Sequence, residues 1–405
     1  MKIRFRILST ITVFSFLFYS CEKNEETFND TASEIDIVND IGANQAIPGE
    51  YIIVYHQDQS ISGKSAEIEN KSNKILSRQG ISIKNIKNTY SKAIQGFTAR
   101  NLSAEQATSL REDPAVAYVE PNYILKANFK SGKPVSSLPP TVQNKAVIND
   151  SQLSNGEFLP WGINRVGRGN GVGKTCWIID SGIAPHSDLT IDTNQSISFV
   201  GGSWVDEDGH GTHVAGTVAA RNNGSGVIGV AYGATVVAVR VLDADGNGTV
   251  DGLIQGVDYV ADNANTGETW NFSVGFNSRF TSQAIDDAFR NLERTTYGAT
   301  SAGNSNDDTQ FYSPKLLQTP NTWVVGNMTN TDAPASGSNF GRSVDRWAPG
   351  TDVWSTWLNG QFNRISGTSM ASPHVAGILL LRGNSTATDG SVSKGGHTAP
   401  IATLN

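Results

Sequence analysis

The stretch SGTSMASPHVAGILL, residues 366–380, joins a turn of small residues to an apolar segment of helical length, with Ser369 at the junction. The first turn of a helix has backbone N–H groups without intrahelical partners and carries the positive end of the helix dipole. Negative charge created beside Ser369 would therefore be stabilised, as the nucleophile of a hydrolase requires. The simpler interpretation is that Gly-Thr-Ser is a common tripeptide and that Pro373 marks the first turn of an ordinary helix.

Two upstream segments each place a residue of catalytic type at the end of an element. In TCWIIDSGI, residues 175–183, an apolar run predicts a buried parallel strand that ends at Asp180 and is followed by a turn. In α/β folds, chemistry is found at the carboxyl ends of such strands. In DEDGHGTHVAGTVAA, residues 206–220, polar residues precede His210 and a helix of small and apolar residues follows it. The order along the chain is aspartate, histidine, serine.

This order distinguishes the families that use such a triad. α/β-Hydrolases run serine, aspartate, histidine, chymotrypsin-like enzymes run histidine, aspartate, serine, and subtilisins run aspartate, histidine, serine. On these motifs, over roughly residues 160–382, the chain resembles subtilisin-like serine proteases, with motifs most like those of the proteinase K branch. The resemblance implies a three-layer α/β fold with a central parallel sheet in residues 158–405. It implies Asp180 as the acid, His210 as the base and Ser369 as the nucleophile.

The chemistry of the triad explains why these residue types are needed together. The imidazole takes the proton of the serine hydroxyl as it attacks the peptide carbonyl, and a buried carboxylate orients the ring. The base must be neutral, so we expect activity to fall as the pH drops and His210 takes up a proton. The resemblance adds an oxyanion hole, built from the Asn304 side-chain amide in GATSAGNSN and the Ser369 backbone N–H. His213 is expected to be a packing residue.

The resemblance also implies two walls of a substrate cleft. TWNFSVGF, residues 269–276, matches the family strand that pairs with an extended substrate backbone. The residues expected to line the cleft are Ser273, Val274 and Gly275 on one wall and Ser301, Ala302 and Gly303 on the other. None of these carries a charge, so the primary pocket is expected to be open and uncharged. We expect broad endopeptidase activity that favours apolar or aromatic residues before the scissile bond.

The segment DADGNGTVDGLI, residues 243–254, imitates a calcium-binding EF-hand loop in its first six positions. The twelfth position of such a loop supplies a bidentate glutamate, and here it is Ile254. The apolar run before the loop also predicts a strand, whereas an EF-hand requires a helix. We therefore expect no EF-hand site, and the resemblance implies a surface loop beside the substrate cleft.

No cofactor is expected for catalysis, but the resemblance implies a structural calcium site. Proteinase K-like enzymes build this site from two backbone carbonyls and one aspartate, which correspond here to Pro320, Thr322 and Asp345. Oxygen ligands suit this hard cation. The alternative is that Asp345 pairs with Arg342 or Arg346, and the sequence leaves both possibilities open.

Residues 49–123 carry the pattern of a separate small domain. Strands are predicted at residues 51–55, 83–90, 93–100 and in VAYVEPN, with helices at 64–77 and from Ser103, whose capping box is completed by Gln106. The βαββαβ order predicts a small α+β, ferredoxin-like domain. It resembles the inhibitory propeptide of subtilisins, which helps the protease to fold and blocks its cleft until it is cut away. An unrelated binding domain is the alternative.

The remaining segments predict export and processing. Residues 124–157 are expected to be a linker with the processing site, because SGKPVSSLPP breaks regular structure. Residues 1–21 have basic residues before an apolar run too short to span a bilayer, which predicts a secretory signal. Its end resembles a bacterial lipoprotein signal, with Cys21 lipidated and residues 22–48 as a polar tether; an ordinary cleaved signal is the alternative. Processing in the linker would free the protease from any lipid.

Composition fits an exported enzyme without a disulfide framework. The 405 residues have a formal net charge of −7, which offers no basic face for nucleic acid. Besides Cys21 the sequence contains one cysteine, Cys176, which is expected to be a buried hydrophobe in the strand before Asp180. We expect a monomer that acts on proteins or peptides, in the bacterial cell envelope or outside the cell.

Two other functions compete with this interpretation. A noncatalytic peptide-binding lipoprotein would keep the cleft, but the full set Asp180, His210, Asn304 and Ser369 argues against it. A sedolisin-like enzyme shares the serine turn, but it uses glutamate where this chain has His210. We therefore expect a serine endopeptidase that is made as a self-processed zymogen.

Overall fold

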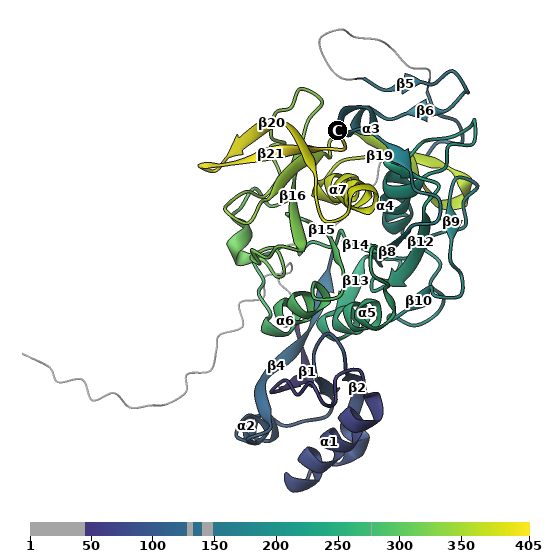
Figure 1. Cartoon of the computed structure of the whole chain (residues 1–405). Coiled ribbons are helices and arrows are strands. Elements are labelled where there is room, and N and C mark those ends of the chain that lie inside the picture. The colour runs from purple at the N-terminus through teal and green to yellow at the C-terminus, as the bar shows by residue number, and fades with distance from the viewer. Residues whose placement is uncertain (1–44, 128–132, 140–148, 277) are drawn as a thin grey trace, which may run out of the picture. The chain divides into compact units, whose positions relative to one another are not determined.

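The computed structural model describes residues 45–127, 133–139, 149–276 and 278–405 (Figure 1). The signal peptide with Cys21 and most of the predicted tether lie outside the described residues, as do two parts of the predicted linker. The described residues belong to one compact unit, Gly42–Asn405. Within them, no helix combines the length and the apolar character that crossing a membrane requires.

The domain predicted for residues 49–123 has the predicted βαββαβ order. Its elements are β1 (Gln45–Tyr55), α1 (Ser65–Arg78), the 3-10 helix η1 (Ile83–Asn85), β2 (Ile86–Tyr90), β3 (Gly96–Ala99), α2 (Ala104–Arg111) and β4 (Val116–Lys126). The antiparallel strands lie in the order β4-β1-β3-β2, which is the ferredoxin-like arrangement. The predicted capping box of α2 is present, since Ser103 and Gln106 each accept the backbone N–H of the other.

The two faces of this small sheet bury different partners. Successive strand residues point to opposite faces. Ile53 and Phe97 pack with side chains of α1 and α2. Ile52 and Val54 instead join a cluster that contains side chains of α5 (Val250–Asn263) and α6 (Gln283–Leu292). The small domain therefore packs on the larger one through one face of its sheet.

The centre of the larger domain is a ten-stranded sheet in the order β10-β12-β8-β14-β15-β16-β17-β21-β20, with β9 beside β12. All its pairings are parallel except that of β20 with β21. Its strands are β8 (Thr175–Asp180), β9 (Thr190–Ile191), β10 (Ile197–Ser198), β12 (Thr235–Arg240), β14 (Thr269–Phe272), β15 (Tyr297–Ser301), β16 (Thr322–Met328), β17 (Arg346–Pro349), β20 (Ala387–Lys394) and β21 (His397–Thr403).

Helices cover both faces of this sheet (Figure 1). On β8, Cys176 and Ile178 pack with α4 (His210–Ala219) and α7 (Thr368–Arg382), whereas Trp177 and Ile179 pack with α5 and α6. An apolar residue at every position is typical of a parallel strand covered on both sides. The predicted three-layer α/β fold is confirmed. Cys176 is the predicted buried hydrophobe, and burial raises the pKa of its thiol to about 12.

The remaining elements are short. They are β5 (Ser151–Gln152), β6 (Phe158–Leu159), α3 (Trp161–Val166), β7 (Gly169–Asn170), β11 (Ala231–Tyr232), β13 (Asn247–Thr249), η2 (Thr309–Phe311), β18 (Val353–Thr356), η3 (Leu358–Gly360) and β19 (Phe362–Ile365). Strand β4 continues to Lys126 and β5 begins at Ser151, so parts of the range predicted as linker, residues 124–157, have regular structure.

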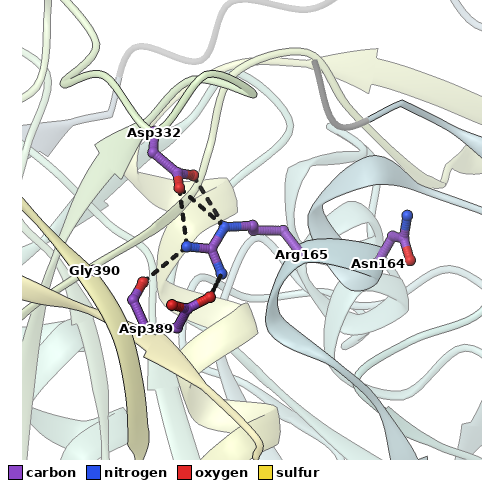
Figure 2. Close-up of a pocket in the computed structure, with 5 residues that line it drawn as sticks. All are labelled: Asn164, Arg165, Asp332, Asp389 and Gly390. Carbon is purple, nitrogen blue, oxygen red and sulfur yellow. Dashed lines mark hydrogen bonds and ion pairs between the residues drawn. The ribbon is translucent and has the colours of Figure 1, made fainter. Parts of the chain in front are cut away.

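A polar cluster ties α3 to the C-terminal hairpin (Figure 2). Arg165 donates from Nε and Nη2 to the Asp332 carboxylate at 3.0 and 2.9 Å. It also donates from Nη1 to the Asp389 carboxylate at 3.2 Å and from Nη2 to the Asp389 carbonyl at 2.8 Å. All three guanidinium nitrogens are thus engaged within the chain, and the Arg165 side chain links α3 to β20.

Three strand ends define the edge of the sheet where the predicted site lies. β8, β14 and β15 are adjacent and parallel, so the residues that follow them emerge at the same edge. Asp180 ends β8, residues 273–275 follow β14, and residues 302–304 follow β15. The topology therefore gathers segments that lie far apart in the sequence.

Candidate active site

Asp180 and His210 form a buried hydrogen bond. Asp180 Oδ1 lies 2.7 Å from His210 Nδ1 and also accepts the Ser181 backbone N–H at 2.7 Å. The two side chains are 0% and 2% exposed. Because an ionised carboxylate can only accept, Nδ1 carries the hydrogen and Nε2 is the basic nitrogen of the ring. The structure thus brings together the acid and the base that the two motifs predicted.

Glycines let the start of α4 approach the turn after Asp180. His210 is the first residue of α4, as predicted. A Cβ at Gly211 would lie 2.1 Å from the Gly182 carbonyl oxygen, so no larger residue fits there. Gly209 has φ +108°, and a Cβ at that position would lie 2.4 Å from the Trp357 ring. The small residues around the histidine therefore set its distance from the aspartate.

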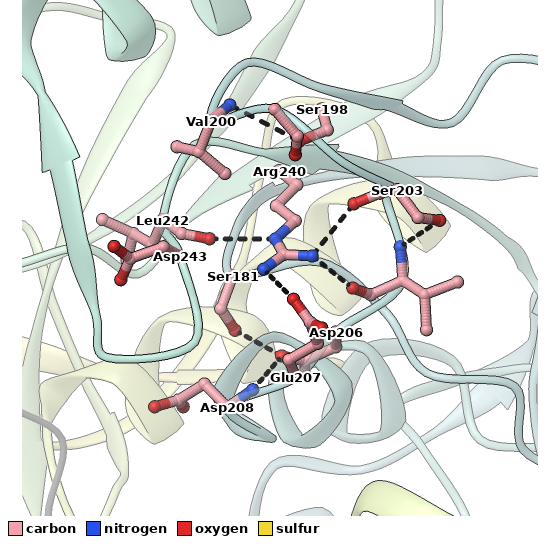
Figure 3. A network of polar contacts seen from close by, with 12 residues as sticks. Ser181, Ser198, Val200, Ser203, Asp206, Glu207, Asp208, Arg240, Leu242 and Asp243 are labelled. Carbon is pink, nitrogen blue, oxygen red and sulfur yellow. Dashed lines mark hydrogen bonds and ion pairs between the residues drawn. The ribbon is translucent and has the colours of Figure 1, made fainter.

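A second buried carboxylate, Asp206, fixes the loop that leads to His210 (Figure 3). Its Oδ1 accepts the Ser181 hydroxyl at 2.9 Å and two backbone N–H groups of the loop at 3.0 Å each. Its Oδ2 accepts the Thr212 backbone N–H at 2.9 Å and hydroxyl at 2.6 Å. Asp206 thus joins the turn after β8 to the first turn of α4. Sequence reasoning missed it, although an acidic residue just before a helix start is a usable signal.

Arg240, the last residue of β12, holds the same loop from another side (Figure 3). Its Nη1 donates to the Ser203 and Val205 carbonyls at 2.9 and 2.7 Å. Its Nε donates to the Leu242 carbonyl at 3.1 Å, and its Nη2 to the Glu207 carboxylate at 2.6 Å. The side chain is 4% exposed. Sequence reasoning missed this anchor too, since three of its four acceptors are backbone carbonyls.

Ser369 is the second residue of α7 and forms a reciprocal pair of hydrogen bonds with Ser273. Its hydroxyl donates to the Ser273 carbonyl at 2.9 Å, and the Ser273 hydroxyl donates to the Ser369 carbonyl at 3.0 Å. In a regular helix that carbonyl would accept the N–H four residues on, but Pro373 has none. Pro373 is the sixth residue of α7, beyond its first turn. The Ser273 hydroxyl therefore replaces the missing helical hydrogen bond.

Two further buried side chains orient the Ser273 hydroxyl. Asn271 Nδ2 donates to Ser273 Oγ at 2.8 Å, and Ser372 Oγ donates to Asn271 Oδ1 at 2.7 Å. All three residues are 0% exposed. The hydrogen bonds thus run from α7 to β14 and back, and they fix the serine turn relative to the sheet edge.

Asn304 lies beside the first turn of α7 with its side-chain oxygen fixed. Its Oδ1 accepts the Thr368 backbone N–H at 2.9 Å and the Thr368 hydroxyl at 3.0 Å. The amide nitrogen therefore points away from Thr368 and lies over Gly367, where a Cβ would be 3.3 Å from it. Thr368 thus uses both its backbone N–H and its hydroxyl to fix the orientation of the Asn304 amide.

Asn339 shapes the loop that carries Asn304. It donates from Nδ2 to the Ala302 carbonyl at 3.0 Å and accepts the Ser305 N–H at 2.9 Å. Gly303 has φ +104°, and a Cβ there would lie 2.4 Å from Asn339 Nδ2. The loop thus needs glycine at this position. Asn339 belongs to no motif that sequence reasoning recognised.

Of the predicted cleft residues, Ser301 is the last residue of β15, and the other five directly follow β14 or β15. Ser301 and Ala302 are fully buried, and Gly275 faces open space, since a Cβ there would meet no atom within 4 Å. None of the six predicted residues is charged. However, the Val274 carbonyl accepts a hydrogen bond from Nζ of the buried Lys315 at 2.6 Å. Sequence reasoning missed this lysine, which stands behind one predicted wall.

Comparison with known proteins identifies the family. Residues 172–388 match the model of the subtilase family, Peptidase S8. The chain belongs to the subtilase family. Residues 50–128 match the model of peptidase inhibitor I9. The small domain is therefore an I9 domain that precedes a subtilase domain, as the resemblance to subtilisin propeptides predicted.

The subtilase has relatives in several organisms. Alkaline serine exoprotease A of Vibrio alginolyticus is 36% identical over 362 residues, which are 83% of this chain and 60% of that protein. The extracellular serine proteinase of Thermus sp. (strain Rt41A) is 33% identical over 356 residues, which are 84% of this chain and 81% of that protein. The crystal structure of a cold adapted subtilisin-like serine proteinase is 37% identical and covers 55% of this chain and 83% of its own, with a TM-score of 0.49.

The subtilase domain adds a strand, β13, to the edge of the I9 sheet. Residues 124–126 of β4, the tail of the I9 domain, pair antiparallel with residues 247–249 of β13. The Ala127 N–H continues this pairing by donating to the Gly246 carbonyl at 2.9 Å. The partner of the tail is therefore the loop that imitates an EF-hand.

That loop is closed by its own hydrogen bonds. The Asp243 carboxylate accepts the backbone N–H groups of Asp245 and Asn247 at 2.9 and 2.8 Å. Strand β12 precedes the loop, and Ile254 is fully buried in α5. The prediction that a strand precedes this loop, where an EF-hand has a helix, is confirmed.

Two carboxylates join the I9 and subtilase domains. Asp258 of α5 accepts three successive backbone N–H groups, residues 91–93, at 3.1, 2.8 and 2.6 Å. Glu120 of β4 accepts the hydroxyl of Ser282, the cap of α6, and the Gln283 N–H at 3.1 Å. Burial raises the pKa of both carboxyl groups. Asp258 and Glu120 are thus held by hydrogen bonds, whereas Asp251, another buried acid of the interface, forms an ion pair with Lys87 at 3.4 Å.

Two other histidines of the subtilase domain are buried in its packing. His213 donates from Nε2 to the Val353 carbonyl at 3.0 Å and meets the Trp357 ring edge-on at 6.2 Å. His374 donates from Nδ1 to the Met370 carbonyl at 2.8 Å. Burial lowers their pKa values to about 3 and about 4, so both are neutral near pH 7. The prediction that His213 is a packing residue is confirmed.

The predicted calcium ligands have oxygens suited to the ion. Asp345 is largely buried; its Oδ2 accepts the Val324 N–H at 2.8 Å, and burial raises its pKa to about 6. Arg346 donates from Nη1 to the backbone carbonyl of Asp345 at 2.7 Å and forms no ion pair with the Asp345 carboxylate. The Pro320 carbonyl accepts a side-chain amide at 3.0 Å. In the described part of the chain, no three His, Cys, Asp or Glu side chains gather around a metal position, so such a site would depend on carbonyls.

Proposed function

We propose that this subtilase is a serine endopeptidase that works through an acyl-enzyme. The observation that carries the proposal is the buried Asp180–His210 hydrogen bond, at the sheet edge defined by β8, β14 and β15. His210 Nε2 takes the proton of Ser369 Oγ as the hydroxyl attacks the peptide carbonyl, and returns it to the leaving amine. Asp180 holds the Nδ1–H and stabilises the imidazolium. Water then attacks the acyl-enzyme by the same route.

The proposed oxyanion hole consists of the Asn304 amide and the Ser369 backbone N–H. It is supported by the Asn304 oxygen, which Thr368 holds so that the nitrogen is turned away from Thr368. The Ser369 hydroxyl leaves the Ser273 carbonyl during attack, and that carbonyl becomes available to the substrate backbone. Donors placed before the reaction begins lower the barrier without reorganisation.

The proposed substrate is an extended peptide between residues 273–275 and 301–303. Backbone pairing recognises no particular side chain, which supports broad specificity. The six residues carry no charge, and the space beside Gly275 is open. We propose a preference for apolar or aromatic residues before the scissile bond. A library in which Arg or Lys at that position is cleaved best would contradict it.

The precursor is proposed to be a zymogen inhibited by its own I9 domain. The pairing of β4 with β13 supports this, because the tail lies along a loop proposed to border the cleft. The cut is proposed to fall in the part of the linker that lies beyond Lys126, since residues 124–126 belong to a strand. The exact bond is not assigned. The first cut would be made by the Ser369 hydroxyl of the same molecule.

Export is proposed from the signal in residues 1–21, and a relative named as extracellular supports it. A lipid on Cys21 would anchor the precursor, and processing in the linker would release a monomeric protease. Fractionation tests this: the cut enzyme is expected in the soluble fraction and the I9 fragment in the membrane fraction. Cys21→Ala should move the I9 fragment into the soluble fraction. Cut enzyme in the membrane pellet would contradict release.

A structural calcium ion is proposed at Pro320, Thr322 and Asp345. These residues would supply two backbone carbonyl oxygens and one carboxylate oxygen, the ligands that this cation prefers. The ion would stabilise the loop before β16 and take no part in the reaction.

Processing of the precursor tests the proposed function. The full chain, Ser369→Ala and His210→Ala are purified and followed by gel electrophoresis and casein hydrolysis. The full chain is expected to split into I9 and subtilase fragments and to hydrolyse casein, and the two variants to stay intact and inactive. A noncatalytic peptide-binding protein would leave all three intact. Self-cleavage by Ser369→Ala would overturn the proposal.

A further inference from the structure

Lys315 is a buried cation that the proposed reaction does not use. It is 1% exposed, and its Nζ donates to the Val274 carbonyl at 2.6 Å. The same Nζ lies 4.7 and 5.4 Å from the ring centres of Phe272 and Phe276. The Lys315 side chain thus contacts Phe272, the last residue of β14, and both Val274 and Phe276 beyond the end of that strand.

The charge environment of Lys315 is sparse. Among the described residues, Asp286 of α6 is the one titratable group whose charge acts on it, and no carboxylate forms an ion pair with it. Burial lowers the pKa of Lys315 to about 7 and raises that of Asp286 to about 6. Asp286 itself faces Ser313, Arg290, Asp287 and Glu120. A buried ammonium without an ion pair is costly, so its contacts need an explanation.

The segment that Lys315 contacts lies beyond the end of a strand. β14 ends at Phe272, so residues 273–275 have left the sheet ladder on which the strand depends. Gly275 faces open space. An extended segment that offers one edge to a substrate needs its opposite polar groups satisfied by the protein. At Val274, the Lys315 ammonium supplies that partner from behind.

We propose that Lys315 is a positioning residue for substrate binding. By holding the Val274 carbonyl, it keeps residues 273–275 in the extended conformation that receives the substrate backbone. This inference rests on the proposed function, because it assumes that the segment pairs with substrate. The ammonium donates a stronger hydrogen bond than the neutral amine. The tether therefore weakens as the pH rises and Lys315 loses its proton, so KM rises while turnover of the bound substrate is retained.

The test compares Lys315→Met and Lys315→Gln with the wild type, as processed enzyme obtained from the full-length precursor. Met keeps the apolar stem and removes the donor, and Gln keeps a donor that does not titrate. Arg165→Met is the matched control, since it removes a buried cation from the cluster between α3 and β20. Active sites are counted with a fluorophosphonate. KM and kcat are then measured from pH 6 to pH 9 on a peptide with Phe before the scissile bond.

Lys315→Met is expected to raise KM about tenfold at pH 6, because the variant loses a charge-assisted hydrogen bond. Its kcat should stay within about twofold of the wild-type value. The difference in KM should shrink towards pH 9, and the KM of Lys315→Gln should be independent of pH. Arg165→Met should lower the Tm and leave KM unchanged.

Two outcomes overturn the inference. In one, Lys315→Met lowers the Tm as Arg165→Met does and leaves KM unchanged, which is a structural role only. In the other, kcat falls at constant KM. If Lys315→Met does not fold, the wild type decides, because a KM that stays flat from pH 6 to pH 9 contradicts the tether. Failure of the proposed function would be seen separately, as absence of fluorophosphonate labelling in the wild type.

Discussion

Asn304 uses its side-chain oxygen and nitrogen for different tasks. The oxygen is held by Thr368, and the nitrogen is the proposed oxyanion donor. Asn304→Leu is expected to lower kcat about 100- to 1000-fold, the range known for this donor in subtilisin, because the amide acts on the transition state. KM should change little. Steady-state kinetics on active-site-titrated enzyme measures both. Asn306→Gly, at an exposed asparagine two residues on, is the control, and a large rise in KM at constant kcat would contradict the role.

Asp345 tests the proposed calcium site through stability. If the site binds calcium, the ion stabilises the folded state alone, and calcium at 100 times its Kd should raise the Tm by roughly 5 to 10 °C over the value in EGTA. Asp345→Asn should abolish this difference. Differential scanning calorimetry of the Ser369→Ala precursor avoids self-digestion. If the protein with an unmutated Asp345 has the same Tm in calcium and in EGTA, the proposed calcium site is contradicted.

At the scale of elements, the junction of α7 with β14 depends on the Ser273 hydroxyl. Ser273→Ala leaves the Ser369 carbonyl and the Asn271 amide without this partner, so we expect the free energy of unfolding to fall by about 1 to 3 kcal/mol. Ser372→Ala removes one donor to Asn271 and should cost less. Urea denaturation of both variants measures the difference. Equal stabilities would show that the carbonyl needs no donor.

Patterns within single elements predicted most of the fold. The apolar run before Asp180 predicted a buried strand, and the structure confirms it. The polar residues before His210 and the small-residue turn before Ser369 predicted two helix starts, which are also confirmed. These signals are local, since they depend on the polarity of successive residues and on the change from turn residues to an apolar helical segment. The topology of parallel strands then brought the predicted residues to one edge.

Contacts between distant elements could not be predicted. Arg240 and Lys315 bond mainly to backbone carbonyls, and any residue supplies a carbonyl, so sequence holds no sign of the partner. Asn339 bonds to backbone N–H and C=O groups of a loop more than thirty positions away. β4 was predicted to end near Asn122 but continues to Lys126, because residues 124–126 pair with β13 of the other domain.

At the scale of the whole molecule, the buried acids of the interface predict how the I9 domain is held. The pKa values of Asp258 and Glu120 are raised in the complex by burial. The complex therefore binds more protons than the separated domains, so association should strengthen as the pH falls towards the carboxyl range and weaken as the pH rises. After self-cleavage, size-exclusion chromatography is expected to retain more I9 fragment on the subtilase domain at pH 5.5 than at pH 8.5.

The control for this prediction lies outside the interface. Asp258→Asn should reduce the pH dependence, whereas Asp389→Asn, at a carboxylate of β20 whose side chain is 76% exposed, should leave it unchanged. Tighter retention of the I9 fragment at pH 8.5 than at pH 5.5 would show that other groups govern the interface.

The proposed reaction depends on Ser369 as a nucleophile that His210 activates. Its most direct test is the site of fluorophosphonate attachment, measured by mass spectrometry of peptides from processed wild type and from the Ser369→Ala and His210→Ala precursors. We expect one adduct, on Ser369, in the wild type, none in Ser369→Ala, and labelling slowed by orders of magnitude in His210→Ala. An adduct on another residue, or labelling of His210→Ala at the wild-type rate, would contradict the proposed reaction.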